Sequence, residues 1–189
     1  KKMIASEVFK RYRKIDYVLI LVAAVVWLGV ATGLDYLNPQ LGYLLSLLVG
    51  LSLLSFAVLI VKKAGAGLLF MGVSGILTSH IADIGVLGVE KFVVFMLSGL
   101  VFEIVFVLLK LEIKDIQMDI LGGTAAAGLF IPLFMGLVIS SSLAWQLING
   151  LINMMLTSFF VGVIASVIGF LIWHRFRTTK FMVKMMYGV

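Results

Sequence analysis

The sequence contains no cysteine, two prolines, two histidines and few charged residues. Without cysteine the chain can form no disulfide, no thiolate metal site and no cysteine nucleophile. Its histidines, His80 and His174, lie far apart in the chain, which argues against a histidine-rich zinc site. We therefore expect neither a metal ion nor a cofactor.

Charge is scarce in proportion to apolar residues. Only 13% of the 189 residues are charged and 62% are hydrophobic, whereas soluble domains are about 25% charged and about half apolar or less. A core of this size cannot hide so much apolar surface, so lipid must contact most of it. The net charge of +6 does not indicate a nucleic acid partner, because the basic residues flank apolar spans.

Hydropathy predicts six membrane-spanning helices; five are close to the roughly 20 residues that cross the hydrocarbon, and the sixth is the longest. The predicted spans are 17–34, 41–61, 64–81, 92–109, 120–139 and 145 (or 147) to 173. No repeat or long linker divides the chain, which predicts a single all-α bundle over 1–189 with basic segments at 1–16 and 174–189. No signal-peptide cleavage site is recognisable, so we expect the first span to be retained.

Lysine and arginine fall almost entirely on one side of this arrangement. Residues 1–16 carry six, the loop after the second span two, the loop 110–119 two and the tail four, which is fourteen of the fifteen. Only Lys91 falls on the other side. Because basic residues in short loops stay inside the cell, both termini are predicted to be cytoplasmic in a plasma membrane protein. The basic N-terminal segment is also expected to meet anionic lipid.

Glu103 is the acidic residue deepest inside an apolar span. It lies six residues before Leu109, roughly 9 Å from the predicted cytoplasmic end at about 1.5 Å rise per residue. A carboxyl group at that depth is costly unless it is paired, protonated or facing water, so it is a candidate functional residue. The alternative is that it hydrogen-bonds a neighbouring helix and only fixes the packing.

A polar stripe on the sixth span is the second candidate site. Gln146, Asn149, Asn153 and Thr157 are spaced three, four and four residues apart, which puts them on one helical face, with Trp145 at its outer end. Amides and an indole suit a small ligand with a polar edge and an aromatic ring. The alternative is that these amides join helices to one another.

A third group of polar residues lies at the predicted outer side: Asp35, Tyr36, Asn38, Thr78, His80, Asp83 and Glu90. His80 and Asp83 are three residues apart and would pair if the helix extended that far, although we expect loop residues solvated by water. The excess of acid on this side predicts attraction of a cationic solute.

Motifs for catalysis are missing. The sequence has no Walker A, HExxH or GxSxG pattern, so we expect no enzyme and no ATP hydrolysis by that route. It also lacks the arginine spacing of voltage sensors and the signature of a carbonyl selectivity filter.

Several segments resemble the S-components of energy-coupling factor (ECF) transporters, in particular the branch assigned to thiamine or its hydroxymethylpyrimidine precursor. These are KKAGAG at 62–67, GLVFE at 99–103 and GFLI at 169–172 before a basic tail, together with the size and six spans. The resemblance implies a subunit that binds a small molecule from outside and topples to release it. Its implied partners are a transmembrane coupling subunit and two cytoplasmic ATPase subunits.

The substrate-binding residues predicted on this basis are Trp145, Gln146, Asn149 and Asn153, with Glu103 and His80. Members of the family often carry an Ala-xxx-Ala docking motif in the first span. This chain has Ala24 followed by Leu28, with Gly29-xxx-Gly33 as a substitute that we also expect to pack within the protein. Two alternatives are a non-catalytic membrane anchor or assembly subunit, and an ion-coupled carrier that uses Glu103.

Overall fold

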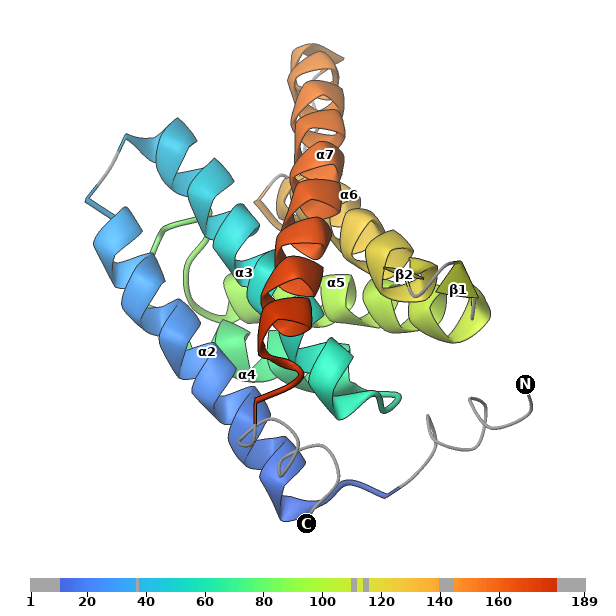
Figure 1. The fold of residues 1–189 in the computed structure, drawn as a ribbon. Coiled ribbons are helices and arrows are strands. Elements are labelled where there is room, and N and C mark those ends of the chain that lie inside the picture. The colour runs from blue at the N-terminus through green and yellow to red at the C-terminus, as the bar shows by residue number, and fades with distance from the viewer. Residues whose placement is uncertain (1–10, 37, 110–111, 114–115, 140–144, 180–189) are drawn as a thin grey trace.

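The computed structural model describes residues 11–36, 38–109, 112–113, 116–139 and 145–179, without the side chains of 39, 112–113, 116, 139 and 145–149. The elements in chain order are α2 (Lys14–Leu34), α3 (Pro39–Val61), α4 (Ala66–Leu77), α5 (Gly88–Leu109), β1 (Glu112–Ile113), β2 (Ile116–Gln117), α6 (Met118–Ile139) and α7 (Trp145–Phe176) (Figure 1). The two short strands pair antiparallel within the charged loop 110–119.

The predicted all-α membrane class is confirmed. In the described ranges there are six helices, and five of them are long and apolar enough to cross a membrane. The exception is α4, whose 12 residues span about 18 Å at a rise of 1.5 Å per residue. Our predicted third span, 64–81, is therefore too long at its C-terminal end, where the helix ends at Leu77.

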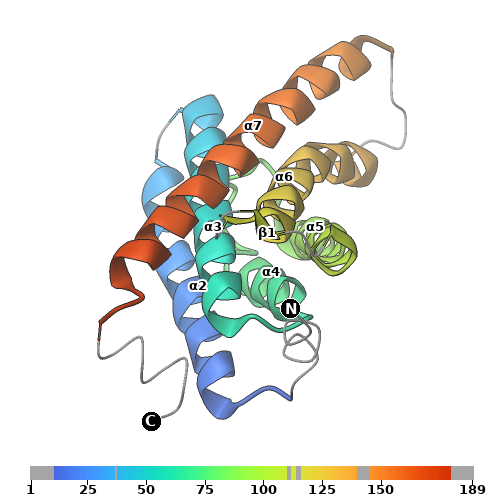
Figure 2. The same ribbon diagram turned by 45° about the vertical axis from the view of Figure 1, so that its right-hand side comes forward.

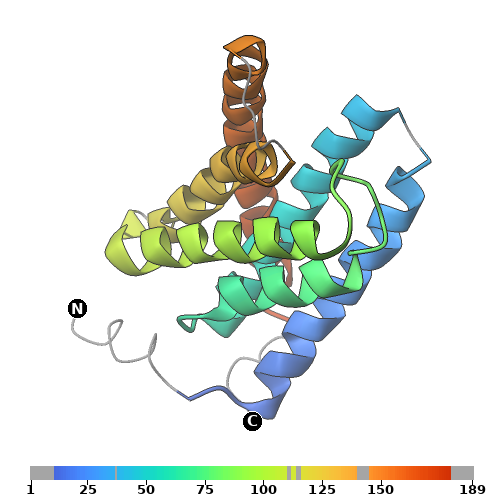
Figure 3. The same cartoon turned by 180° about the vertical axis from the view of Figure 1, so that it is seen from behind.

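The central helix is α3, which contacts α2, α4, α6 and α7. Figure 2 shows α7 lying across α3 and α6, with the N-terminal part of α7 extending away from α2. Seen from behind, α4 and α5 lie side by side and cross the direction of α2 (Figure 3). The N-terminal part of α3, the chain after α4 and the N-terminal half of α7 lie toward the same end of the bundle (Figure 1).

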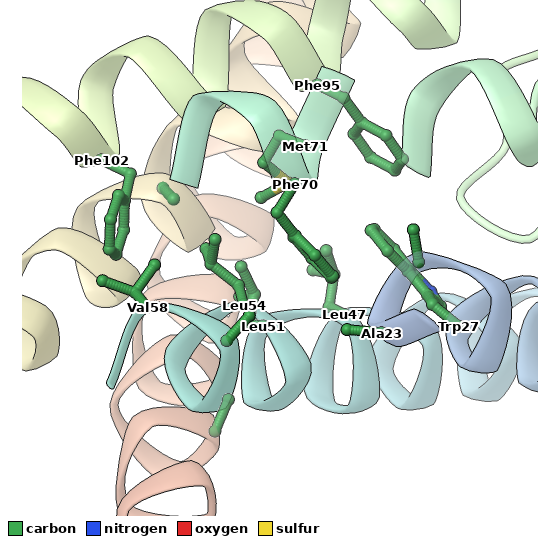
Figure 4. Packing of buried hydrophobic residues seen from close by; sticks show 14 of the residues in the cluster. Ala23, Trp27, Leu47, Leu51, Leu54, Val58, Phe70, Met71, Phe95 and Phe102 are labelled. Carbon is green, nitrogen blue, oxygen red and sulfur yellow. The ribbon is translucent and has the colours of Figure 1, made fainter. Parts of the chain in front are cut away.

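The core between α2, α3, α4 and α5 is built from aromatic and branched side chains (Figure 4). The Trp27 ring stacks on Phe70 with ring centroids 5.9 Å apart and contacts Phe95 at 5.0 Å. All three side chains are buried. Aromatic pairs of this kind contribute about 0.5–1.5 kcal/mol beyond the area they bury, so this cluster fixes α2 against the α4–α5 pair.

The prediction that Gly29 and Gly33 pack within the protein is wrong. A Cβ atom added at either position would meet nothing within 4 Å. The buried face of α2 is formed instead by residues on the other side of the helix, among them Ala24, Trp27 and Ala31. The two glycines therefore lie on the outer face of α2.

The basic segments gather at one end of the bundle, which we call the basic end (Arg11, Arg13, Lys14, Lys62, Lys63, Arg175 and Arg177). Lys63 pairs with Asp16 and also donates to the carbonyl oxygen of Arg11 at 2.9 Å. The Lys62 ammonium lies 5.4 Å from the ring centroid of Trp173 near the end of α7. These contacts bring the start of α2, the α3–α4 turn and the end of α7 together, as the charge pattern predicts.

Tyr12 reinforces the basic end. Its hydroxyl donates to the carbonyl oxygen of Ala64 at 2.8 Å. Burial raises the pKa of the Tyr12 hydroxyl above its usual value, and the negative charges of Glu103 and Asp16 raise it further. The phenol therefore stays protonated and remains a donor across the physiological pH range.

Candidate functional site

A pocket of about 510 Å³ lies at the end of the bundle opposite the basic end. Pockets for small ligands usually measure about 300–1,000 Å³. Its lining comes from the start of α3, the segment after α4, the end of α6 and the N-terminal half of α7. The lining residues are Gln40, Tyr43, Leu44, Ala82, Ile84, Gly85, Met135, Asn153, Met154 and Thr157.

The polar groups of the pocket are hydroxyls and carboxamides. The Tyr43 hydroxyl is 2.8 Å from Ser158 Oγ in a buried hydrogen bond that joins α3 to α7. Thr157 Oγ1 donates to the backbone carbonyl of Asn153 at 2.8 Å. The side chains of Gln40 and Asn153 are exposed. The pocket therefore combines two accessible carboxamides with hydrogen-bonded hydroxyls and apolar side chains.

The structure places one predicted binding residue, Asn153, in this lining, together with Thr157 from the same predicted stripe. The side chains of Trp145, Gln146 and Asn149 lie outside the described residues. Their backbone forms the first turn and a half of α7, directly before the pocket-lining part of that helix.

Glu103 lies toward the basic end, not in the pocket lining. Its Oε1 accepts hydrogen bonds from the backbone N–H groups of Gly67 at 2.7 Å and Leu68 at 3.4 Å. These N–H groups belong to the first turn of α4, where a helix has unpaired donors and favours negative charge. The geometry gives Glu103 the packing role that was our alternative for it.

We expect Glu103→Ala to lower the free energy of unfolding by about 1–3 kcal/mol, because it leaves the two N–H groups without an acceptor. Glu103→Gln keeps an oxygen acceptor and should cost less. Thermal denaturation of the detergent-solubilised variants measures the difference. A Gln variant that melts like the parent but no longer binds or transports a ligand would instead assign Glu103 to the ion-coupled carrier mechanism.

His80 is exposed in the turn that follows α4 and does not line the pocket. The pairing of His80 with Asp83, which required the helix to extend that far, is not formed, because α4 ends at Leu77 and the Asp83 carboxylate pairs with Lys91. Our expectation that Asp83 is a solvated loop residue is also wrong.

Asp83 and Lys91 form a fully buried ion pair beside the pocket. The Lys91 ammonium also donates to the carbonyl oxygens of Thr78 and Ile81, both at 2.9 Å. The other Asp83 oxygen accepts a hydrogen bond from Ser46 Oγ. The three acceptors of Lys91 all lie in the segment that follows α4, so this lysine supplies donors to carbonyl oxygens that the end of the helix leaves free.

Sequence reasoning missed this pair, although a signal was present. Lys91 is the one basic residue that the charge pattern places on the far side of the membrane, and it is followed by an apolar helix. A lysine on the side that the positive-inside rule leaves without basic residues needs another explanation, and pairing with a buried carboxylate is a common one. Asp83, eight residues earlier, was the available partner.

Metal coordination has no support in the described part of the chain. Within it, no group of three or more His, Cys, Asp or Glu side chains comes close enough to hold a metal ion.

The apolar helices and the pocket between them define a multi-pass helical membrane protein. No protein-family model, curated protein or solved structure matches the chain. Its function has to be inferred from the pocket and the distribution of charge.

Proposed function

We propose that this protein is the substrate-binding membrane subunit of an ATP-driven importer for a small heterocycle of the thiamine or pyrimidine type. The observation that carries the proposal is the pocket, which combines carboxamides with apolar side chains. Carboxamides at Gln40 and Asn153 can read the nitrogen atoms and exocyclic groups of a ring, because each offers a donor and an acceptor. Leu44, Ile84 and Met135 supply the apolar surface that a flat ring needs.

The distribution of charge supports import. All described lysine and arginine residues other than Lys91 belong to the basic end. The positive-inside rule assigns that end to the cytoplasm. The pocket then faces the outside of a plasma membrane, where it would meet a scarce nutrient first. Such a subunit receives its substrate from outside and delivers it inward.

The proposed partners are a transmembrane coupling subunit and two ATPase subunits. The chain carries no Walker A sequence, so the energy for uptake has to come from another protein. The outer face of α2, with Gly29 and Gly33 open to the surroundings, supports docking of a partner helix because small residues allow close backbone approach. This glycine pair replaces the Ala-xxx-Ala motif of the family that the chain resembles.

The direct test is identification of the ligand. Mass spectrometry of small molecules that co-purify with the detergent-solubilised protein should detect a heterocycle, and 4-amino-5-hydroxymethyl-2-methylpyrimidine should raise its melting temperature. A protein that carries no small molecule, shows no thermal shift with pyrimidines or thiamine and purifies only with other membrane subunits would be a membrane anchor instead.

We expect Asn153→Ala to weaken binding of that pyrimidine by about tenfold, which corresponds to the loss of about one hydrogen bond. The matched control is Ile152→Ala, because Ile152 is the preceding residue of α7, is exposed and does not line the pocket. Isothermal titration or thermal shift at several ligand concentrations measures the affinity. Equal affinities for the two variants would remove Asn153 from the binding site.

A further inference from the structure

We infer that the pocket selects uncharged ligands over permanently cationic ones, an inference that rests on the proposed function. The ten described lining residues include no Asp, Glu, Lys, Arg or His. The sequence between α6 and the described side chains of α7, residues 140–149, contains no ionisable residue either. A ligand that enters this pocket therefore finds hydrogen-bonding groups but no counter-ion among the described lining residues.

The carboxylate that lies between two lining residues in sequence is already neutralised. Asp83 lies between the lining residues Ala82 and Ile84, yet its side chain is completely buried. One of its oxygens accepts from the Lys91 ammonium and the other from Ser46 Oγ. Because the charges of Asp83 and Lys91 cancel and both oxygens are occupied, this carboxylate is not available to balance a positive ligand.

The remaining acidic groups near this end are in contact with solvent. Asp35 and Glu90 are exposed, and neither lines the pocket. Water and salt screen such groups, so they contribute little to a ligand inside the pocket. Our prediction from the sequence that an acid excess would attract a cationic solute counted Asp83 among the free acids, which it is not.

The cost of burying a charge should separate two ligands that both contain the aminopyrimidine ring. Moving a charged group out of water is costly unless a partner of opposite charge and hydrogen bonds replace its hydration. A neutral aminopyrimidine alcohol has no such cost, whereas thiamine carries a fixed positive charge on its thiazolium ring. The same reasoning disfavours a phosphorylated pyrimidine, because the lining offers no cation.

The experiment compares these ligands on the purified full-length protein. The probes are 4-amino-5-hydroxymethyl-2-methylpyrimidine, its phosphate ester and thiamine, titrated at a pH at which the aminopyrimidine is unprotonated. We expect the neutral pyrimidine to bind at least about tenfold more tightly than either charged probe. Thiamine binding as tight as that of the neutral pyrimidine overturns the inference alone, whereas binding of no probe overturns the proposed function and the inference with it.

Gln40→Glu provides the gain-of-charge variant. Gln40 is exposed in the first turn of α3, where an acidic side chain is favourable for the helix, so the variant should fold. It places a carboxylate in the lining and should tighten thiamine binding by about three- to tenfold without tightening that of the neutral pyrimidine. Glu90→Gln, which changes an exposed charge outside the pocket, is the control and should leave the ratio of affinities unchanged. An unchanged thiamine affinity in Gln40→Glu contradicts the inference.

Discussion

Replacing Lys91 by methionine is expected to lower the free energy of unfolding by about 3–5 kcal/mol, because removing one member of a buried ion pair leaves the other charge uncompensated. The Asp83 carboxylate would remain in a fully buried site with only Ser46 as its partner. The carbonyl oxygens of Thr78 and Ile81 would lose their donor as well. Thermal denaturation in detergent, followed by tryptophan fluorescence or size-exclusion chromatography, measures the loss.

A matched series of variants tests whether loss of the ion pair causes the destabilisation. Asp83→Leu alone should be comparably destabilising, since it leaves the ammonium buried without a counter-ion. The double variant Lys91→Met with Asp83→Leu should recover a large part of the loss, because apolar replacements of a buried pair are often tolerated. Single-variant losses that simply add in the double variant would show that the two residues are not coupled. Ser46→Ala should cost about 1–3 kcal/mol, because it leaves one Asp83 oxygen and the Trp27 indole N–H without a partner.

Gly162→Leu is expected to separate α6 from α7. A Cβ atom at Gly162 would lie 2.7 Å from the carbonyl oxygen of Thr124 and 2.9 Å from the Cα atom of Ala125. Both atoms belong to the backbone of α6, so no side-chain rotation can relieve the clash. Overpacking of this kind usually costs about 1–3 kcal/mol, and a whole leucine against backbone should reach the upper part of that range. Ligand affinity should fall too, because α6 and α7 both line the pocket.

Gly136→Ala is the control for that variant. Its Cβ would meet only the side chain of Leu151, at 3.5 Å or more, which is an ordinary contact. Alanine is also the better helix former by up to about 1 kcal/mol, so this variant should melt at or slightly above the parent temperature. Similar losses for Gly162→Leu and Gly136→Ala would mean that the α6–α7 contact is not as close as described.

Hydropathy predicted most of the helices because a chain in lipid has to hydrogen-bond its backbone groups internally, and a helix does so within one segment. The predicted spans 41–61, 92–109 and 120–139 each lie within two to four residues of α3, α5 and α6. The third span was predicted to run to Ile81, although the residues from Thr78 to His80 are polar. Directly after α4 the Lys91 ammonium of the next helix donates to the carbonyl oxygens of Thr78 and Ile81, a contact that no local pattern contains.

The candidate site was predictable to the extent that it follows helical geometry. Asn153 and Thr157 are four residues apart and reach the same pocket, as the spacing indicated. The contributions of Gln40, Tyr43 and the segment at 82–85 depend on how α3, α7 and the chain after α4 meet. The burial of Asp83 likewise depends on tertiary folding, because in sequence it reads as an ordinary loop acid.

The contacts of Lys91 also explain why that position holds lysine rather than arginine. An ammonium group is tetrahedral and has three protons to give, and in this protein three oxygen atoms, on Thr78, Ile81 and Asp83, each receive one. A guanidinium group is flat and has five donors in a fixed fork. In the same buried site a guanidinium would bring two donors more than these three oxygens can accept, so the site matches lysine in the number of donors as well as in charge.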